Sequence, residues 1–266
     1  MKPIPNQIFK KLYQPPAKSH KWDNGTLMII GGSKKYHGAP WFSIMAASHF
    51  IDLVFFNSVP ENSKLISEVK SKTAQFSFIS DKELNKYIRE VDAVLMGPGL
   101  NINQAVKKKV NNILKNFPNK KFVLDADALN VLDKKNIKNK KIILTPHRKE
   151  FQRLFNLDAN QANVHKMCKK YGIIIVLKGL KDIVCDKKTC YYNSVGNQGQ
   201  TKGGTGDVLA GIIAAFSCKS DQLLSAQAGT LLIGLAANDL KKTHGFNFNA
   251  TELANQLPLS LKKHSS

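Results

Sequence analysis

Short apolar runs alternate with segments of helical periodicity over almost the whole chain, and this alternation limits the folds open to it. Strands that alternate with helices form a mostly parallel sheet covered by helices on both faces, so we expect an α/β fold. Strands are predicted over residues 26–30, 52–56, 75–79, 92–96, 121–124, 142–144 and 173–177. Helices are predicted over residues 39–50, 103–117, 159–171, 206–216, 221–240 and 251–261, with Thr251 as the N-cap of the last.

A hairpin interrupts this rhythm late in the chain. Residues 182–185 and 189–193 flank a polar turn, which predicts two antiparallel strands at an edge of the sheet. The chain shows no linker-like segment, no low-complexity stretch and no internal repeat. We therefore expect a single domain over residues 1–266, with residues 1–20 as an N-terminal extension.

The formal net charge of +21 raises the question of a nucleic-acid partner. Most lysines form scattered pairs, residues 107–109 are the one lysine triplet, and no basic motif is interleaved with aromatic residues. We interpret the charge as solvated surface that can also concentrate a polyanionic small molecule such as a nucleotide. A non-enzymatic nucleic-acid binder is thus the less favoured alternative.

No apolar run reaches the roughly 18 residues that span a membrane, and residues 1–22 lack the apolar core of a secretory signal. We expect a cytoplasmic protein without a membrane partner. The four cysteines, Cys168, Cys185, Cys190 and Cys218, form no CxxC pair. Although Cys185 and Cys190 can face each other on neighbouring strands, we expect reduced thiols and no metal site.

Unusual residues follow five of the apolar strands directly. In parallel sheets, ligands bind outside the carboxyl ends of the strands. Any one of these segments could be an ordinary turn, but five of them at one edge favour a shared ligand crevice. The segments are Gly31-Gly32, Gly97-Pro98-Gly99, Asp125-Ala126-Asp127, Thr145-Pro146-His147 and Lys178-Gly179.

The strongest single motif is the glycine-rich stretch from Gly196 to Asp207, which precedes an apolar, small-residue helix. Glycines let backbone amides approach a ligand, and the N-terminus of a helix favours phosphate. A helix-dipole role would explain Asp207 and one or two glycines, but not five. The stretch fits neither the P-loop pattern nor the dinucleotide-binding fingerprint.

Asp207 is placed to act as a base at such an anion site. Its carboxylate can take a proton from a substrate hydroxyl while the amides of the loop stabilise charge on a transferring phosphoryl group. The residues alone therefore predict a phosphoryl-transfer enzyme.

Together these motifs resemble the ADP/ATP-dependent NAD(P)H-hydrate dehydratases of the ribokinase-like superfamily, over about residues 21–261. The resemblance implies a three-layer α/β/α sandwich with a mostly parallel central sheet. Its most specific carriers are Asp125-Ala-Asp-Ala-Leu-Asn130 and Thr145-Pro-His147, in that order, because the Gly-Thr-Gly-Asp loop alone indicates only the superfamily.

The resemblance implies a repair lyase for NADHX and NADPHX, the hydrated forms of NADH and NADPH. A nucleotide, with ADP favoured over ATP, phosphorylates the ring hydroxyl of the S epimer in the presence of Mg²⁺, and phosphate is then eliminated. The chain would work as a homo-oligomer, with a homotetramer as one option, and the epimerase activity would be absent or reside in a separate protein. The alternative is a small-molecule kinase of the same superfamily, acting on a vitamin precursor or a sugar.

Residue by residue, the resemblance makes Asp207 the catalytic base and a substrate contact. It places Ala39, Gly99 and His147 in the rest of the substrate site, although His147 could simply cap a neighbouring loop. It assigns the nucleotide to Lys178, Gly179, Leu180, Lys181, Asp182, Gly203, Gly204, Thr205 and Gly206. It gives supporting roles to Asp125, Asp127, Asn130, Glu150 and Asn197, of which the first three shape the site or assist Mg²⁺, and it implies no dedicated metal ligand.

The chain departs from the family pattern at several of these loops. Arg148-Lys149 stands where Pro-Gly is usual before Glu150, Asn101 replaces a glycine, and Asp182 replaces a threonine. Polar residues between Asn197 and Gly203 replace small residues and a methionine. The catalytic aspartate is retained, so these changes bear on nucleotide contacts and substrate choice.

Overall fold

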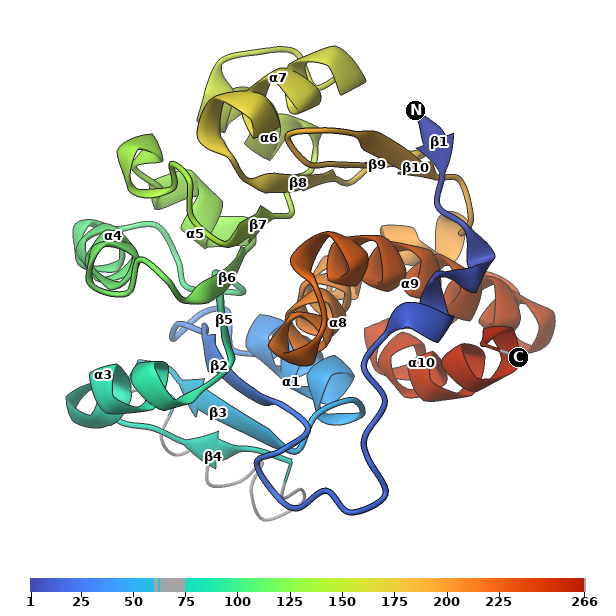
Figure 1. The fold of residues 1–266 in the computed structure, drawn as a ribbon, viewed down its shortest axis with the longest axis horizontal. Coiled ribbons are helices and arrows are strands. Elements are labelled where there is room, and N and C mark those ends of the chain that lie inside the picture. Colours follow the sequence, from blue (N-terminus) through green and yellow to red (C-terminus); the bar gives the residue numbers. More distant parts are fainter. Residues whose placement is uncertain (60–61, 63–74, 266) are drawn as a thin grey trace.

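One ten-stranded sheet carries the structure, and helices cover both of its faces (Figure 1). The computed structural model describes residues 1–59, 62 and 75–265. The strands lie in the order β1-β10-β9-β8-β7-β6-β5-β2-β3-β4. Only the β8–β9 and β9–β10 pairs are antiparallel, and every other pair is parallel. The predicted mostly parallel α/β architecture is thus confirmed.

The elements alternate along the chain much as the apolar pattern predicts. The strands are β1 (Lys2–Pro3), β2 (Thr26–Ile30), β3 (Leu53–Asn57), β4 (Ser77–Phe78), β5 (Ala93–Met96), β6 (Lys121–Leu124), β7 (Ile142–Leu144), β8 (Ile174–Leu177), β9 (Asp182–Cys185) and β10 (Cys190–Asn193). The helices are α1 (Gly38–Ser48), α3 (Asp81–Glu90), α4 (Gln104–Asn116), α5 (Ala126–Val131), α6 (Arg148–Phe155), α7 (Gln161–Tyr171), α8 (Thr205–Lys219), α9 (Gln222–His244) and α10 (Ala250–His264). The part of the chain that the structure describes also contains the short 3₁₀ helices η1 (Asn6–Lys11), η3 (Lys134–Asn136) and η4 (Gln198–Thr201). Helices α3, α5 and α6 and strand β1 were not predicted.

The two faces of the sheet belong to two separate apolar cores. Successive residues of a strand point to opposite faces, so Leu27 and Ile29 of β2 pack in the core under α1, α8 and α9. Met28 and Ile30 pack in the other core, with α3 to α7. Because both faces are covered, β2 is buried along its whole length, as is typical of a central parallel strand.

Helix α9 is long and apolar enough to pass a simple test for a membrane-spanning helix, with a mean hydropathy of 1.2 over its best window. That window is 72% buried inside the protein, where α9 packs on α8 and α10. Such burial is typical of the core helix of a globular domain.

The N-terminal residues are part of the sheet edge. Lys2 and Pro3 pair in parallel with Tyr191 and Tyr192 of β10. Ile8 and Phe9 of η1 are buried in the core next to α9. The N-terminal segment thus covers the edge of the hairpin β9–β10 and stabilises it.

The last helix begins earlier than predicted, so the assignment of Thr251 as its N-cap is wrong. Asn249 caps α10, and its side-chain oxygen accepts hydrogen bonds from the backbone nitrogens of Thr251 and Glu252 at 2.8 and 3.1 Å. Glu252 accepts in turn from the backbone nitrogen of Asn249 at 2.7 Å. This reciprocal capping box leaves Thr251 as the second residue of the helix, where its backbone nitrogen is one of the capped donors.

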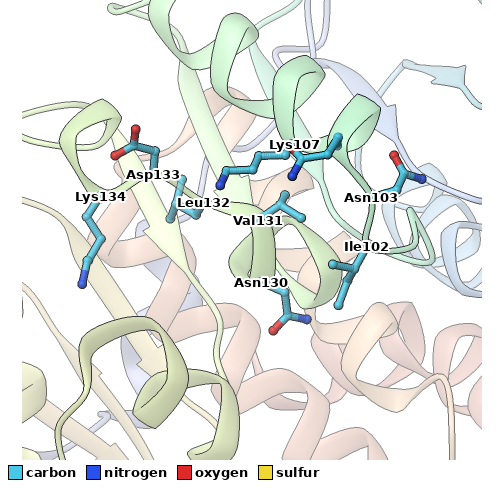
Figure 2. A pocket seen from close by; sticks show the side chains of 9 residues that line it. Ile102, Asn103, Lys107, Asn130, Val131, Leu132, Asp133 and Lys134 are labelled. Atoms are coloured by element: carbon cyan, nitrogen blue, oxygen red, sulfur yellow. The ribbon is translucent and has the colours of Figure 1, made fainter.

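A cavity of about 600 Å³ lies between the start of α4 and the segment that follows α5 (Figure 2). Asn130 and Val131 of α5 line it on one side, and Asn103 and Lys107 line it on the α4 side. Helices α4 and α5 cover the face of the sheet opposite to α8 and α9 (Figure 1).

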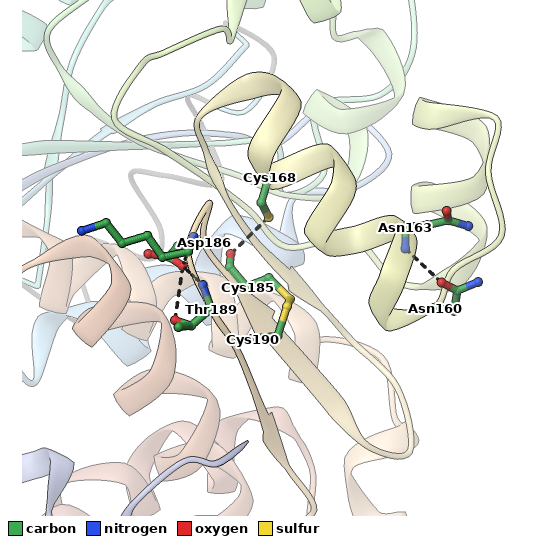
Figure 3. The surroundings of a disulfide bond; sticks show 8 residues. Asn160, Asn163, Cys168, Cys185, Asp186, Thr189 and Cys190 are labelled. Atoms are coloured by element: carbon green, nitrogen blue, oxygen red, sulfur yellow. Dashed lines mark hydrogen bonds between the residues drawn. A yellow bond between two sulfur atoms is a disulfide. The ribbon is translucent and has the colours of Figure 1, made fainter. Parts of the chain in front are cut away.

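Two of the four cysteines form a disulfide, which corrects the expectation of four reduced thiols (Figure 3). Cys185 and Cys190 stand directly opposite each other in the β9–β10 ladder, with a Cα–Cα distance of 4.1 Å. Such a separation is typical of a non-hydrogen-bonded antiparallel pair, which brings the side chains close. Cys168 and Cys218 remain free and buried, and burial raises the pKa of Cys168 to about 12.

The disulfide predicts that reduction lowers stability. Opening a loop this short should cost about 2 kcal/mol, seen as a drop of a few degrees in the melting temperature with dithiothreitol. The double variant Cys185→Ala/Cys190→Ala should melt at the same temperature with and without the reductant. A thiol assay of the unfolded, unreduced protein should find Cys168 and Cys218 only, and four reactive thiols would refute the bond.

Candidate active site

The five strand-end segments meet at one edge of the sheet. Their strands β2, β5, β6, β7 and β8 are consecutive and parallel, so their carboxyl ends lie side by side. Backbone hydrogen bonds continue the ladder past the strands and join each segment to its neighbour. These bonds run from Gly97 N to Ile30 O at 3.1 Å, Asp125 N to Met96 O at 3.1 Å, Thr145 N to Leu124 O at 3.1 Å, and Lys178 N to Pro146 O at 2.8 Å.

A buried ion pair sits at the centre of this edge. The Lys178 Nζ donates to Asp125 Oδ1 at 2.7 Å, and the Thr145 hydroxyl donates to the same oxygen at 2.8 Å. Asp125 is 2% exposed. Burial acts to lower the pKa of Lys178, but Asp125, Glu150 and Asp207 outweigh it and raise that pKa above its ordinary value. Lys178 is therefore a cation held in place by buried acceptors.

Asp207 lies in the first turn of α8, close to this lysine. An added Cβ on Gly206 would be 3.5 Å from the Lys178 Nζ, so the ammonium lies against the start of the helix. Burial and the charge of Asp125 raise the pKa of Asp207 to about 8, although Lys178 opposes them. A carboxyl that titrates near neutral pH suits a general base.

The glycines before α8 leave the helix start open. Gly204 is the N-cap residue, with a φ of 95°, and no side chain caps the helix. A Cβ at Gly204 would lie 2.5 Å from the Phe42 ring, so only glycine fits there. The Thr205 backbone nitrogen donates to the Lys202 oxygen at 3.4 Å, and the N–H groups of Gly206 and Asp207 are available to an anion.

Helix α1 is locked against α8 next to Asp207. The Ser43 hydroxyl donates to the backbone oxygen of Asp207 at 2.8 Å, and a Cβ at Gly211 would clash with the Ser43 backbone at 2.5 Å. Ala39 lies one turn before Ser43, and a Cβ on Gly99 would be 3.3 Å from the Ala39 Cβ. The structure therefore brings Ala39 and Gly99 together, beside the helix that carries Asp207.

His147 caps α6, which was the alternative to a substrate role. Its Nδ1 accepts from the backbone nitrogens of Lys149 and Glu150 at 3.1 and 3.2 Å, and Glu150 accepts from the His147 backbone nitrogen at 2.8 Å. With Nδ1 accepting, the proton of the neutral ring is on Nε2, which lies 3.5 Å from a Glu150 oxygen. The side chain of His147 is 50% exposed, and its backbone forms an isolated parallel β-bridge with Lys178. His147 therefore caps α6 and also presents its Nε2 donor at the strand edge.

The Asp125-to-Asn130 element holds neighbouring loops in place. Asp127 Oδ2 accepts from the backbone nitrogen of Asn101 at 2.8 Å, which fixes the loop after β5. Asn130 accepts from Arg153 of α6. Ala126 has a φ of 47°, an unfavourable value for a residue with a Cβ, and such strain is concentrated at functional sites.

Asp182 connects the Lys178-Gly179 turn to the start of the glycine-rich stretch. One carboxylate oxygen accepts from the Gly179 backbone nitrogen at 3.0 Å and the other from the Asn193 side chain at 3.3 Å. Asn193 also donates to the backbone oxygen of Val195 at 3.0 Å. Burial raises the pKa of Asp182 to about 6. Leu180, in the same turn, is fully exposed.

The polar residues that depart from the family pattern form hydrogen bonds within the glycine-rich loop and to the segment next to it. Asn197 caps η4 and Gln200 completes the capping box by accepting from the Asn197 backbone nitrogen at 3.1 Å. Lys202 donates to the backbone oxygens of Phe246 and Phe248 at 3.0 and 2.7 Å. The loop is thus held from within and by the connection between α9 and α10.

Three structuring residues escaped sequence reasoning, namely Ser43, Arg153 and Asn193. Asn193 is 3% exposed and also donates to the Thr230 backbone oxygen at 3.1 Å. Its place at the end of a strand, just before the glycine-rich stretch, was the available signal. The other two carried no pattern that marked them.

The raised pKa of Asp207 predicts a pH-dependent stability cost. Between about pH 4 and pH 8 the native state binds a proton that the unfolded state has lost, so stability falls as pH rises over this range. Asp207→Asn removes the charge and should be more stable than the parent at about pH 8, by about 2 kcal/mol after allowing for screening. Melting temperatures against pH should converge near about pH 4, and a variant that is less stable throughout would contradict this account.

Comparison with known proteins places the chain among relatives of one kind. The family model described as NAD(P)H-hydrate dehydratase matches residues 27–259. A bifunctional NAD(P)H-hydrate repair enzyme of Methanocaldococcus jannaschii is 35% identical over 95% of this chain and 51% of its own length. An ADP-dependent (S)-NAD(P)H-hydrate dehydratase of Cenarchaeum symbiosum is 31% identical, covering 92% of this chain and 91% of that protein. The chain spans about half the length of the bifunctional relatives.

Solved structures give the same result for the fold. A ribokinase-like superfamily protein of Enterococcus faecalis superposes with a TM-score of 0.89 at 26% identity, covering 98% of this chain and 94% of that one. A Bacillus subtilis ADP/ATP-dependent NAD(P)H-hydrate dehydratase, co-crystallised with ATP and Mg²⁺, has a TM-score of 0.80 over 99% of this chain and 98% of its own, and its 23% identity supports the fold alone. The chain therefore belongs to the NAD(P)H-hydrate dehydratase family of the ribokinase-like superfamily.

Proposed function

We propose that this protein converts the S epimer of NADHX or NADPHX back to NADH or NADPH, with ADP favoured over ATP as phosphoryl donor. The observation that carries the proposal is the carboxyl of Asp207 at the uncapped start of α8, beside the buried cation Lys178. The full-length relatives named ADP-dependent (S)-NAD(P)H-hydrate dehydratase support the substrate and the donor.

The first step is phosphoryl transfer. Asp207 takes the proton of the ring hydroxyl, and the hydroxyl oxygen forms a bond to the terminal phosphorus of the nucleotide. The bond from that phosphorus to its bridging oxygen breaks, and the shortened nucleotide leaves. Lys178 and the backbone N–H groups of the α8 start stabilise the charge on the transferring group.

The second step is elimination. The bond between the ring carbon and the phosphate oxygen breaks, solvent water accepts a proton from the adjacent ring carbon, and the electron pair of that C–H bond restores the double bond of the dihydronicotinamide. Inorganic phosphate is the leaving group, so the sum of both steps is the loss of water at the expense of one phosphoanhydride bond. Protonated Asp207 returns its proton to the departing phosphate or to solvent.

The remaining assignments divide the edge between the two ligands. Ala39, Gly99 and the Nε2 donor of His147 would contact the hydrated cofactor. The nucleotide would lie over residues 178–182 and 203–206. Both Asp182 oxygens have partners within the protein, so this residue would shape the nucleotide loop and not bind the nucleotide through its side chain. Asp125, Asp127, Asn130, Glu150 and Asn197 would hold the loops.

Mg²⁺ fits this edge as a companion of the nucleotide. Among the described residues no group of three histidine, cysteine, aspartate or glutamate side chains is placed to hold a metal. Asp125 is committed to Lys178 and Thr145, which leaves Asp127 and Asp207 as carboxylates beside the phosphates. Mg²⁺ commonly takes one or two carboxylates together with phosphate oxygens, where it neutralises phosphate charge.

The same proposal covers the setting of the enzyme. We expect a cytoplasmic homo-oligomer, for example a homotetramer, without nucleic-acid or membrane partners. A separate protein would supply the epimerase activity. These points rest on the family resemblance and on the sequence composition.

A repair assay tests the function directly. NADHX and NADPHX are incubated with the protein, Mg²⁺ and either ADP or ATP, and the return of nicotinamide absorbance and the release of phosphate are followed. We expect both signals, faster with ADP, and loss of at least a hundredfold in rate for folded Asp207→Asn. A stable phosphorylated product without phosphate release would identify a small-molecule kinase, and no recovery with either nucleotide would refute repair.

The pH dependence of repair tests the role of Asp207. The base must be deprotonated to act, so kcat/KM for the hydrated cofactor should rise with pH and level off above about pH 8. Because kcat/KM reports groups of the free enzyme, the midpoint belongs to the unliganded site. A profile that is flat from about pH 6 to 9 would exclude Asp207 as the titrating base.

A further inference from the structure

The cavity between α4 and α5 has an apolar floor and a polar rim (Figure 2). Val131 and Leu132 are buried or half-buried, and Ile102 adds an exposed apolar side chain at one end. Asn130 and Asn103 provide amide groups, and the side chain of Lys107 reaches across the cavity toward Leu132 (Figure 2). The volume of about 600 Å³ is within the range of small-molecule sites.

Helix α5 connects the cavity to the candidate active site. Asn130 lies one helical turn after Asp127, whose carboxylate holds the Asn101 backbone next to Ile102. Arg153 of α6, the helix that His147 caps, donates to Asn130. A ligand seated at the strand edge can therefore extend over the ends of β5 and β6 into the cavity.

The free charge in the cavity is positive. Lys107 forms no ion pair among the described residues, and α4 has no acidic residue in its first turn. Asp133, the carboxylate that lines the cavity, is paired with Lys135 at 2.9 Å, which lies outside it. Lys134 adds a second cation at the outer end, where its side chain points away from Lys107 (Figure 2).

We propose that this cavity binds the adenosine half of the hydrated dinucleotide, with Lys107 contacting the 2′-phosphate, so that the enzyme prefers NADPHX to NADHX. The inference rests on the proposed repair function. The apolar floor suits a purine face, and the amides suit its polar edge. Dinucleotide sites that select NAD place a carboxylate on the ribose hydroxyl, whereas those that select NADP place a cation there. Here the carboxylate is already paired and the cation is free.

Two neighbouring lysines provide a matched test. Lys107→Gln removes the cation that reaches into the cavity, and Lys108→Gln removes an equal charge from the next position of the same helix, which does not line it. Loss of one charge-assisted contact should lower kcat/KM for NADPHX roughly tenfold in Lys107→Gln and leave NADHX almost unchanged. Lys108→Gln should match the parent on both substrates.

Binding of NADP⁺ and NAD⁺, measured by calorimetry on the same three proteins, separates this inference from the repair function. NADP⁺ should bind more tightly than NAD⁺ to the parent and to Lys108→Gln, and the difference should shrink about tenfold in Lys107→Gln. Because binding of NADP⁺ and NAD⁺ requires no turnover, these measurements test the inference whether or not repair activity is observed. Equal binding of the two dinucleotides by the parent, or equal losses in both variants, would overturn the proposal.

Discussion

The ion pair between Lys178 and Asp125 organises the catalytic edge of this protein. It joins the ends of β6 and β8 across β7, and Thr145 from β7 completes it. The pair is buried, so removing either partner would leave a charge without compensation. Because the ammonium also lies against the start of α8, it fixes the cation of the site relative to Asp207. One interaction thus aligns three strand ends and a helix from the other layer.

The same edge gathers carboxylates that repel one another. Asp125, Asp127 and Glu150 all act to raise the pKa of Asp207, and Lys178 compensates for only part of this. A site that keeps a carboxyl largely protonated at neutral pH gives up stability in the free enzyme as the pH rises. The formal net charge of the chain is +21, but the exposed lysines do little to lower the pKa of Asp207. Salt screens exposed charges over short distances.

Sequence reasoning located the strand-end edge and placed Asp207 beside it because glycines and carboxylates after apolar strands have strong physical causes. It placed the final helix cap at Thr251 and not at Asn249, since both residues are good caps and only geometry separates them. It missed the short helices α5 and α6, whose few turns give little periodicity. The Cys185–Cys190 bond required the exact register of the hairpin, which spacing alone does not give. The sequence does not distinguish Lys107 from the many solvated lysines, because only the structure shows that it lines a cavity.

Strand β1 sets an order on the assembly of the fold. Its partner β10 lies near the other end of the chain, so Lys2–Pro3 can dock only after most of the sheet has been made. Contacts between residues so far apart in sequence are costly to form early, because the intervening loop must first be closed. The buried side chains of η1 likewise cannot pack before α9 has formed. During synthesis the N-terminal segment therefore precedes its packing partners β10 and α9 by most of the length of the chain.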